Sequence, residues 1–335
     1  MTKRNLGSAL GVAILLAGCT PEPEPPTTPA PEAAPAPAAQ PAARAPAAGD
    51  TGIPDSIVAE RGGFIPEGIE YDQLNGRLLT GSLSEGSIFE WHNDGTLTAV
   101  VTDAELVSSV GIEVDEPRNR LLVANSDSAV FQGQGNGQAK LGVYNLTTGE
   151  RLAMVDLGAT LNADADAAFF CNDVTVADDG TVYATDTRQN VIYGVDSNYQ
   201  PSVFYRFAPR EGLALNGLVH HADGYLLVAD LGSGNIYKVP VADPAATSQV
   251  MLAEPVAGVD GLVWMADGRL AAVSNSTSSV VALMSNDDWA SAQVAGVARF
   301  EGQATTAAAV GDDVYVVQPH FADQEPPMIL RAVFE

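Results

Sequence analysis

Four oxygen-bearing side chains open similar stretches of the sequence. Glu67 begins EGIEYDQLNGRLLTGS, Asn172 begins NDVTVADDGTVYATD, Asn216 begins NGLVHHADGYLLVAD and Asp260 begins DGLVWMADGRLAAVS. Two carboxylates and two amides, without His or Cys, are a ligand set for a hard cation. Calcium suits it best because it accepts mixed oxygen ligands in flexible geometry, and magnesium is second. Each dipeptide alone is also a common turn sequence, so the shared position of all four is what favours a metal site.

The four stretches belong to a longer internal repeat. Two further copies begin at Val110 and at Thr305 or Thr306, and successive copies start 43, 62, 44, 44 and about 45 residues apart. Each copy is an apolar segment, a turn rich in Asp, Asn and Gly, and a strand with a polar end, followed by further strand-like runs. Four short strands in each unit of about 44 residues indicate an all-β chain folded as a six-bladed β-propeller.

The geometry of a propeller explains why the four residues could meet. The innermost strand of every blade starts at the same face, beside the central axis, so the residues that open the six strands form a ring. The last repeat lacks an outer strand, and we expect residues 56–61, which precede the first repeat, to supply it and close the circle.

This ordered set resembles the senescence marker protein and gluconolactonase family, which includes regucalcin and is akin to squid phosphotriesterase and paraoxonases. The matching dipeptides are Glu67-Gly68, Asn172-Asp173, Asn216-Gly217 and Asp260-Gly261. The resemblance implies one catalytic divalent cation, usually calcium, held by Glu67, Asn172, Asn216 and Asp260. It also implies that Asp260 acts as general base and that the substrate is a lactone or a related ester.

Three positions depart from the family pattern. Ile69 stands where Pro is frequent, and Val174 stands where Gly is frequent. Phe170 occupies a position at which enzymes for sugar lactones commonly carry Arg. The last difference indicates a less polar substrate than a sugar-acid lactone.

Three further residues are candidates for substrate binding. Asp186 and Asp230 end second strands, which return to the face that carries the metal ring, and His320 lies in the loop that follows another second strand. We expect Asp186 and Asp230 to line the pocket, with capping of turns as the alternative. His320 could donate to the substrate or relay a proton, and an ordinary loop residue is its alternative.

The N-terminal region predicts an envelope lipoprotein. Residues 1–18 resemble a lipoprotein signal peptide, with cleavage before Cys19 and lipidation of its thiol, and in a Gram-negative host this implies the outer membrane. Residues 19–54, which are rich in Pro and Ala, are expected to be a disordered tether because they cannot bury a core. Residues 55–335 are expected to form the propeller, and after lipidation Cys171 has no partner for a disulfide.

The charge of the chain limits its partners. The sequence has 42 acidic and 16 basic residues, a formal net charge of −26. This balance argues against nucleic acid and against anionic membrane surfaces as partners. We expect a monomer that is anchored through Cys19 to the membrane and takes a small lactone or ester. The alternative is a non-catalytic propeller in which calcium stabilises a binding or scaffold module.

Overall fold

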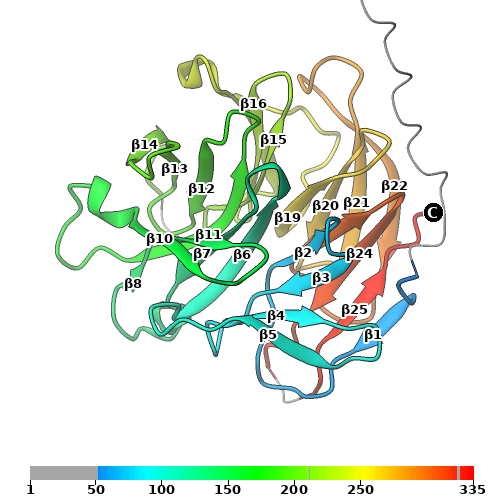
Figure 1. The fold of residues 1–335 in the computed structure, drawn as a ribbon. Helices are drawn as coiled ribbons and strands as arrows, with labels where there is room; N and C mark the ends of the chain where they lie inside the picture. Colours follow the sequence, from blue (N-terminus) through cyan, green and yellow to red (C-terminus); the bar gives the residue numbers. More distant parts are fainter. Residues whose placement is uncertain (1–51, 211, 323–324) are drawn as a thin grey trace, which may run out of the picture. The chain divides into compact units, whose positions relative to one another are not determined.

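The computed structural model describes residues 52–210, 212–322 and 325–335, and within them the prediction of an all-β, six-bladed propeller is confirmed (Figure 1). The signal peptide, Cys19 and nearly all of the proposed tether lie outside these residues. The described part of the chain includes no helix that is long and apolar enough to cross a membrane.

Each blade is an antiparallel sheet of four consecutive strands, innermost first. Blade 1 consists of β2 (Ile69–Asp72), β3 (Arg77–Thr80), β4 (Ile88–Trp91) and β5 (Leu97–Val101). Blade 2 consists of β6 (Ser108–Asp115), β7 (Arg120–Ser126), β9 (Lys140–Asn145) and β10 (Arg151–Asp156). Blade 3 consists of β11 (Phe169–Val176), β12 (Val182–Asp186), β13 (Val191–Val195) and β14 (Pro201–Arg206).

The other three blades repeat this plan. Blade 4 consists of β15 (Leu215–His221), β16 (Tyr225–Asp230), β17 (Asn235–Pro240) and β18 (Ser248–Gln249). Blade 5 consists of β19 (Val259–Trp264), β20 (Leu270–Ser274), β21 (Ser279–Met284) and β22 (Gln293–Arg299). Blade 6 consists of β23 (Ala307–Val310), β24 (Asp313–Gln318), β25 (Met328–Arg331) and, as its outer strand, β1 (Ser56–Val58).

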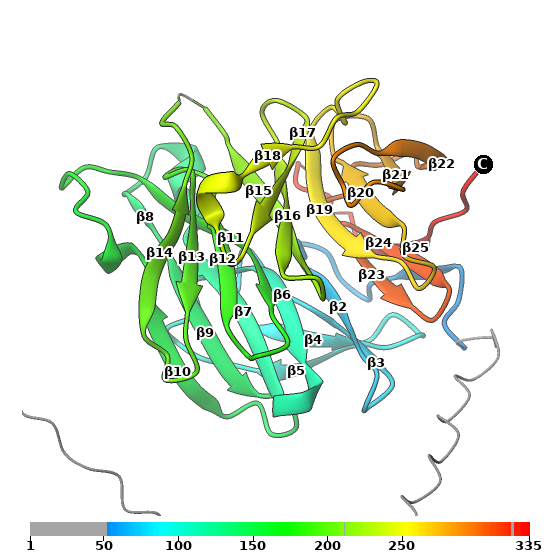
Figure 2. The same ribbon diagram turned by 90° about the horizontal axis from the view of Figure 1, so that it is seen from above.

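The closure of blade 6 by an N-terminal strand is therefore confirmed. Ile57 pairs with Ile329 in an antiparallel ladder, and Asp55 accepts a bond from Arg331 Nε at 2.6 Å. Figures 1 and 2 show β1 in blue beside β25 in red. The two ends of the repeat thus share one sheet, and its outer edge is β1.

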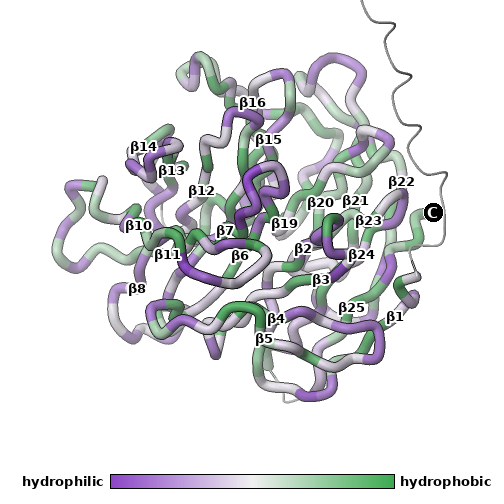
Figure 3. Tube along the Cα trace, in the orientation of Figure 1, coloured by the Kyte–Doolittle hydropathy of each residue, from purple (hydrophilic) through white to green (hydrophobic). Residues whose placement is uncertain are grey.

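The core is divided into six hydrophobic clusters, one at each junction between neighbouring blades. Because side chains alternate between the two faces of a strand, one strand supplies two clusters. In β7, for example, Leu122 and Ala124 pack toward blade 3, whereas Leu121 and Val123 pack toward blade 1. Figure 3 shows the hydrophobic colour along the strands and the hydrophilic colour in many of the connecting loops.

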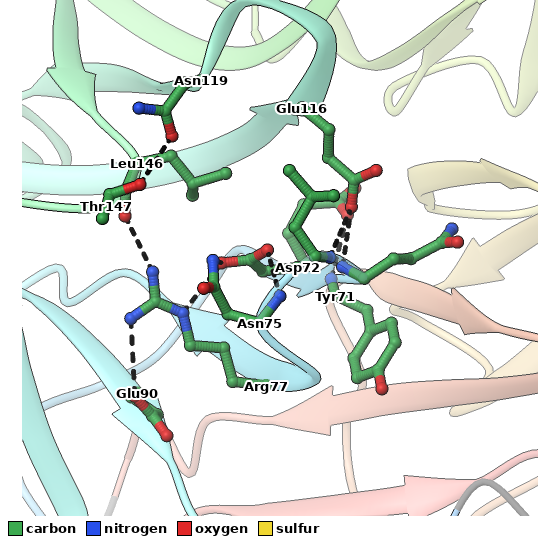
Figure 4. A network of polar contacts seen from close by, with 12 residues as sticks. Tyr71, Asp72, Asn75, Arg77, Glu90, Glu116, Asn119, Leu146 and Thr147 are labelled. Carbon is green, nitrogen blue, oxygen red and sulfur yellow. Dashed lines mark hydrogen bonds and ion pairs between the residues drawn. The ribbon is translucent and has the colours of Figure 1, made fainter.

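Buried ion pairs join blades at the end of the inner strands away from the metal ring. Arg77 donates to Asp72 at 2.8 Å and to the Leu146 carbonyl at 2.8 Å, which links blades 1 and 2 (Figure 4). Blade 2 repeats the device at the same spacing, since Arg120 donates to Asp115 at 2.6 Å and to the Gly180 carbonyl in blade 3 at 3.2 Å.

The connection between β7 and β9 is the largest departure from the simple repeat. It contains a short 3-10 helix, η2 (Ser128–Gln132), and the strand β8 (Gly137–Gln138), which pairs in parallel with the start of β11. This insertion accounts for the greater length of the second repeat, and it lies next to the site described below.

Candidate functional site

A β-bulge interrupts the inner strand of blades 2 to 5 at the same place. In blade 3, Cys171 pairs with Asp186 and Val174 pairs with Ala184, so Asn172 and Asp173 together face one residue of the partner strand. The four bulged dipeptides are Val110-Gly111, Asn172-Asp173, Asn216-Gly217 and Asp260-Gly261. A bulge redirects the side chain that it carries, and here it does so at three of the four predicted ligands.

The inner strands approach one another too closely for a larger residue beside these ligands. A Cβ atom on Gly217 would lie 2.4 Å from the Asp260 carbonyl oxygen, and one on Gly261 would lie 2.1 Å from Thr306 Oγ1. The glycines that follow Asn216 and Asp260 therefore allow neighbouring strands to bring both ligands to the axis.

Two cavities meet at the predicted ligands. The upper cavity has a volume of about 630 Å³ and opens beside η2, while the lower channel has a volume of about 390 Å³ and runs between the inner strands. The residues that line both cavities are Glu67, Asn172, Asn216 and Asp260. Their exposed fractions are only 5–9%, so they form a nearly buried floor between the two spaces.

Asn172 is held in one orientation by a short chain of hydrogen bonds. Its Nδ2 donates to Thr187 Oγ1 at 2.9 Å, and Thr187 donates to the Leu215 carbonyl at 2.6 Å. Because the amide nitrogen is engaged, the Oδ1 atom is left available to a cation. Thr187 itself lines the upper cavity, although sequence reasoning missed it.

Asp260 carries the clearest sign of a missing partner. Its Oδ1 atom is buried and has no hydrogen-bond partner. A buried carboxylate oxygen without a partner is costly, and a cation at that position would satisfy it. The residues present therefore fit a hard cation on the axis.

Burial and mutual repulsion disfavour the charged forms of the two acidic ligands. Burial, together with the charge of Asp173, raises the pKa of Asp260 to about 8, although hydrogen bonds from the Asn216 and Asn275 amides oppose the shift. Burial and the charges of Asp260 and Asp173 also hold the pKa of Glu67 well above its usual range. A bound cation would reverse both effects because an opposite charge favours the carboxylate.

The lower channel holds three more acids that the sequence analysis did not single out. Burial raises the pKa of Asp173 to about 7 and that of Glu70 to about 8, and burial beside Glu70 holds the pKa of Glu113 well above normal. Even so, within residues 52–335, as far as they are described, no three His, Cys, Asp or Glu side chains form a group suited to a metal. The candidate centre depends on its two amides.

Asp186 and Asp230 lie outside both cavities, contrary to the expectation that they line the pocket. Asp186 is fully buried, and its Oδ1 accepts bonds from the Phe170, Arg188 and Gln189 backbone N–H groups, while Tyr193 donates to its Oδ2. Both carboxylate oxygens of Asp230 accept bonds from Arg210 at 2.6 Å. Both acids are thus occupied in fixing loops, which was the alternative that the sequence left open.

His320 lines a separate cavity of about 250 Å³ together with Gln318 and Phe321. The neighbouring Phe321 also lines the upper cavity, so the loop borders the site although the imidazole is not part of its wall. Thr305, in the sixth position of the ring, donates its hydroxyl to the Glu67 carbonyl at 2.9 Å and so joins blade 6 to blade 1.

The fold matches many solved structures, although the sequence matches no family model and no curated relative. The Malassezia sympodialis allergen Mala s 1 gives a TM-score of 0.69 at 14% identity, covering 84% of this chain and 96% of that one. A candidate gluconolactonase gives 0.58 at 15% identity, covering 84% and 94%. Regucalcin from Agrobacterium tumefaciens, described as a calcium-binding protein, gives 0.58 at 15% identity, covering 84% and 95%. At these identities the likeness establishes the fold, and in the fold the resemblance to gluconolactonases and regucalcin is confirmed.

Proposed function

We propose that this protein is a cation-dependent hydrolase of the lactonase or esterase type, with calcium as its ion. The observation that carries the proposal is the buried, unpartnered Asp260 Oδ1 in the floor that both cavities share. The structural likeness to a candidate gluconolactonase and to a calcium-binding regucalcin supports the same assignment.

Glu67, Asn172, Asn216 and Asp260 would hold the ion. When bound, the ion polarises the ester carbonyl and stabilises the oxyanion of the tetrahedral intermediate. The upper cavity gives substrate and water access to Asp260. As the water oxygen bonds to the carbonyl carbon, Asp260 accepts the water proton. The carbonyl carbon–oxygen bond of the ring then breaks, and the proton passes to the leaving oxygen, which yields a hydroxy acid.

We also propose that the enzyme works in a bacterial envelope, tethered through a lipid on Cys19 and the Pro- and Ala-rich residues that follow. The small-molecule substrate, the monomeric state and the outer-membrane location remain part of this proposal. Incorporation of a labelled fatty acid into the wild type, and its loss in Cys19→Ala, would test the anchor.

The catalytic role is tested with Asp260→Asn, measured on a panel of lactones and aryl esters with calcium and with a chelator. Asn keeps an oxygen for the ion but cannot accept a proton at neutral pH. At saturating calcium we expect the rate to fall by about 10²–10⁴-fold. Asp230→Asn is the matched control, since that buried acid lies outside both cavities, and it should keep the wild-type rate.

Two outcomes would overturn the proposal in different ways. A calcium-saturated Asp260→Asn protein with the wild-type rate would remove Asp260 as the base. A wild type that binds calcium but hydrolyses no member of the panel would favour the alternative, a calcium-stabilised scaffold.

A further inference from the structure

The wall of the upper cavity is apolar above its polar floor. Leu83, Val110 and Leu231 line it together with three aromatic rings, those of Phe131, Phe170 and Phe321. A pocket of this size with a few convergent polar groups at its base is typical of a site for a small organic ligand. The polar groups would take the reacting ester, and the wall would take an apolar substituent.

Exposed apolar side chains gather at the mouth of this cavity. Of the eleven large hydrophobic side chains that are exposed in the described residues, four line it: Val107, Phe131, Leu213 and Phe321, with exposed fractions of 36–45%. Single exposed apolar residues are ordinary, but a group of them around one concavity indicates a surface that a ligand covers.

The charges that face the cavity narrow the class of ligand. Its charged side chains are Glu67, Asp127 and Asp260, and it includes no Lys or Arg among the described residues that line it. An anionic acyl chain would meet these acids without a compensating cation. An uncharged ester avoids that repulsion, and the net charge of −26 on the whole chain acts in the same direction.

Phe131 is held in place as part of the wall. The Asp127 side chain caps η2 by accepting from Ala129 N at 3.0 Å, and Ser128 N donates to Ser108 Oγ at 3.1 Å. The Phe131 ring packs edge-on against Phe170, with centroids 4.5 Å apart.

Arg188 adds a contact from blade 3. Its guanidinium carbon lies 4.7 Å from the centre of the Phe131 ring. Such a contact is attractive, and together with Phe170 it fixes the ring between two blades. Phe131 therefore presents a preorganised apolar surface to whatever enters the cavity.

We propose that the upper cavity selects uncharged lactones or esters that carry an alkyl or aryl substituent, with Phe131 as a specificity-determining residue. The inference rests on the proposed hydrolase function for its reaction, but the binding part can be measured without turnover. Arg188 is a positioning residue in this arrangement, because it acts through the Phe131 ring.

The first experiment measures kcat/KM of the full chain, with calcium, on γ-lactones whose side chain grows from none to octyl. Each buried methylene should raise kcat/KM by about fourfold until the cavity is filled. Phe131→Ala should lower kcat/KM at least tenfold for the octyl lactone and less than twofold for the unsubstituted ring. Leu152→Ala is the matched control, because Leu152 is equally exposed, at 47%, but lies outside the cavity; it should change neither value.

The second experiment measures binding of the corresponding γ-lactams, which resist hydrolysis, by titration calorimetry. Affinity that rises with side-chain length and falls in Phe131→Ala would support the cavity inference, and it would do so even if no lactone were hydrolysed. If lactones are hydrolysed at rates that are independent of side-chain length, or if Phe131→Ala matches the wild type, the selectivity inference is wrong and the hydrolase proposal stands. A protein that neither hydrolyses the lactones nor binds the lactams would overturn both.

Discussion

Thr187 determines which atom of Asn172 faces the axis. Its hydroxyl accepts from the Asn172 amide nitrogen and donates to the Leu215 carbonyl, so it fixes the amide and joins blade 3 to blade 4. Residues that orient a metal ligand without touching the ion contribute substantially to affinity. Thr187 is thus a positioning residue of the proposed centre.

Thr187→Val should therefore weaken calcium binding by about 10–100-fold, measured by titration calorimetry. It should also lower the free energy of unfolding by about 1–3 kcal/mol, because two buried polar groups lose their partner. Thr187→Ser keeps the hydroxyl and should restore most of the affinity. Equal calcium affinity in the Val variant and the wild type would contradict the assigned orientation of Asn172.

The buried acids predict how stability depends on pH. The pKa values of Asp173, Glu70 and Asp260 are raised to about 7 or 8, against about 4 in an unfolded chain. Between pH 4 and 8 the folded protein therefore binds more protons at these groups than the unfolded chain does. As a result, their contribution to the free energy of unfolding falls as the pH rises.

Melting temperatures in chelator should accordingly decrease from pH 5 to pH 8. Calcium should reduce that decrease, because the ion favours the ionised form of Asp260. Asp260→Asn should also reduce it, since one titrating group is removed. A melting temperature that rises over this range in chelator would show that the raised pKa values do not govern stability.

At the scale of the strand, the bulge is what converts a repeat into a site. The bulged dipeptides occur in blades 2 to 5 at one register position, and Gly217 allows the blade 4 strand to lie against the Asp260 backbone. The position of Asp260 thus depends on a glycine in the preceding blade.

Gly217→Ala should displace the Asp260 strand, because the new Cβ would lie 2.4 Å from a backbone oxygen that cannot turn away. We expect a loss of about 1–3 kcal/mol in the free energy of unfolding and weaker calcium binding. Gly194→Ala is the control, because its Cβ would have its nearest neighbour at an ordinary 3.5 Å. Denaturant titrations of both variants, with and without calcium, make the comparison. Equal stability of the two would contradict the close approach.

The sequence predicted the repeat, the blade count and the closing strand, because those depend on periodicity and turn residues. It also predicted the residues that line both cavities. It did not predict the bulge, since one extra residue in a strand leaves no mark on the pattern of polar and apolar positions. Asp186 and Asp230 were misplaced for a related reason: their partners are backbone N–H groups and Arg210, which only the folded loops bring near.

At the scale of the whole molecule, the first strand holds the ring closed. Ile57 is buried with an exposed fraction of 2% in the cluster between blades 6 and 1, while its neighbour Val58 is 48% exposed. Ile57→Ala should cost about 2–5 kcal/mol in the free energy of unfolding, and Val58→Ala about 0.5 kcal/mol or less. Urea denaturation measures both changes. A small effect at Ile57 would mean that the ring is stable without its closing strand.

That closure also sets an order of events during synthesis. A ribosome makes β1 first, yet its partner β25 appears only when the chain is nearly complete. The site has the same requirement, because the Glu67 backbone is bonded by Thr305 of the last blade. Long-range pairing of this kind is slow and leaves strand edges exposed to other chains. Calcium therefore cannot guide the early steps of folding, since the ligands from blades 1 and 5 come together only after the last blade has been made.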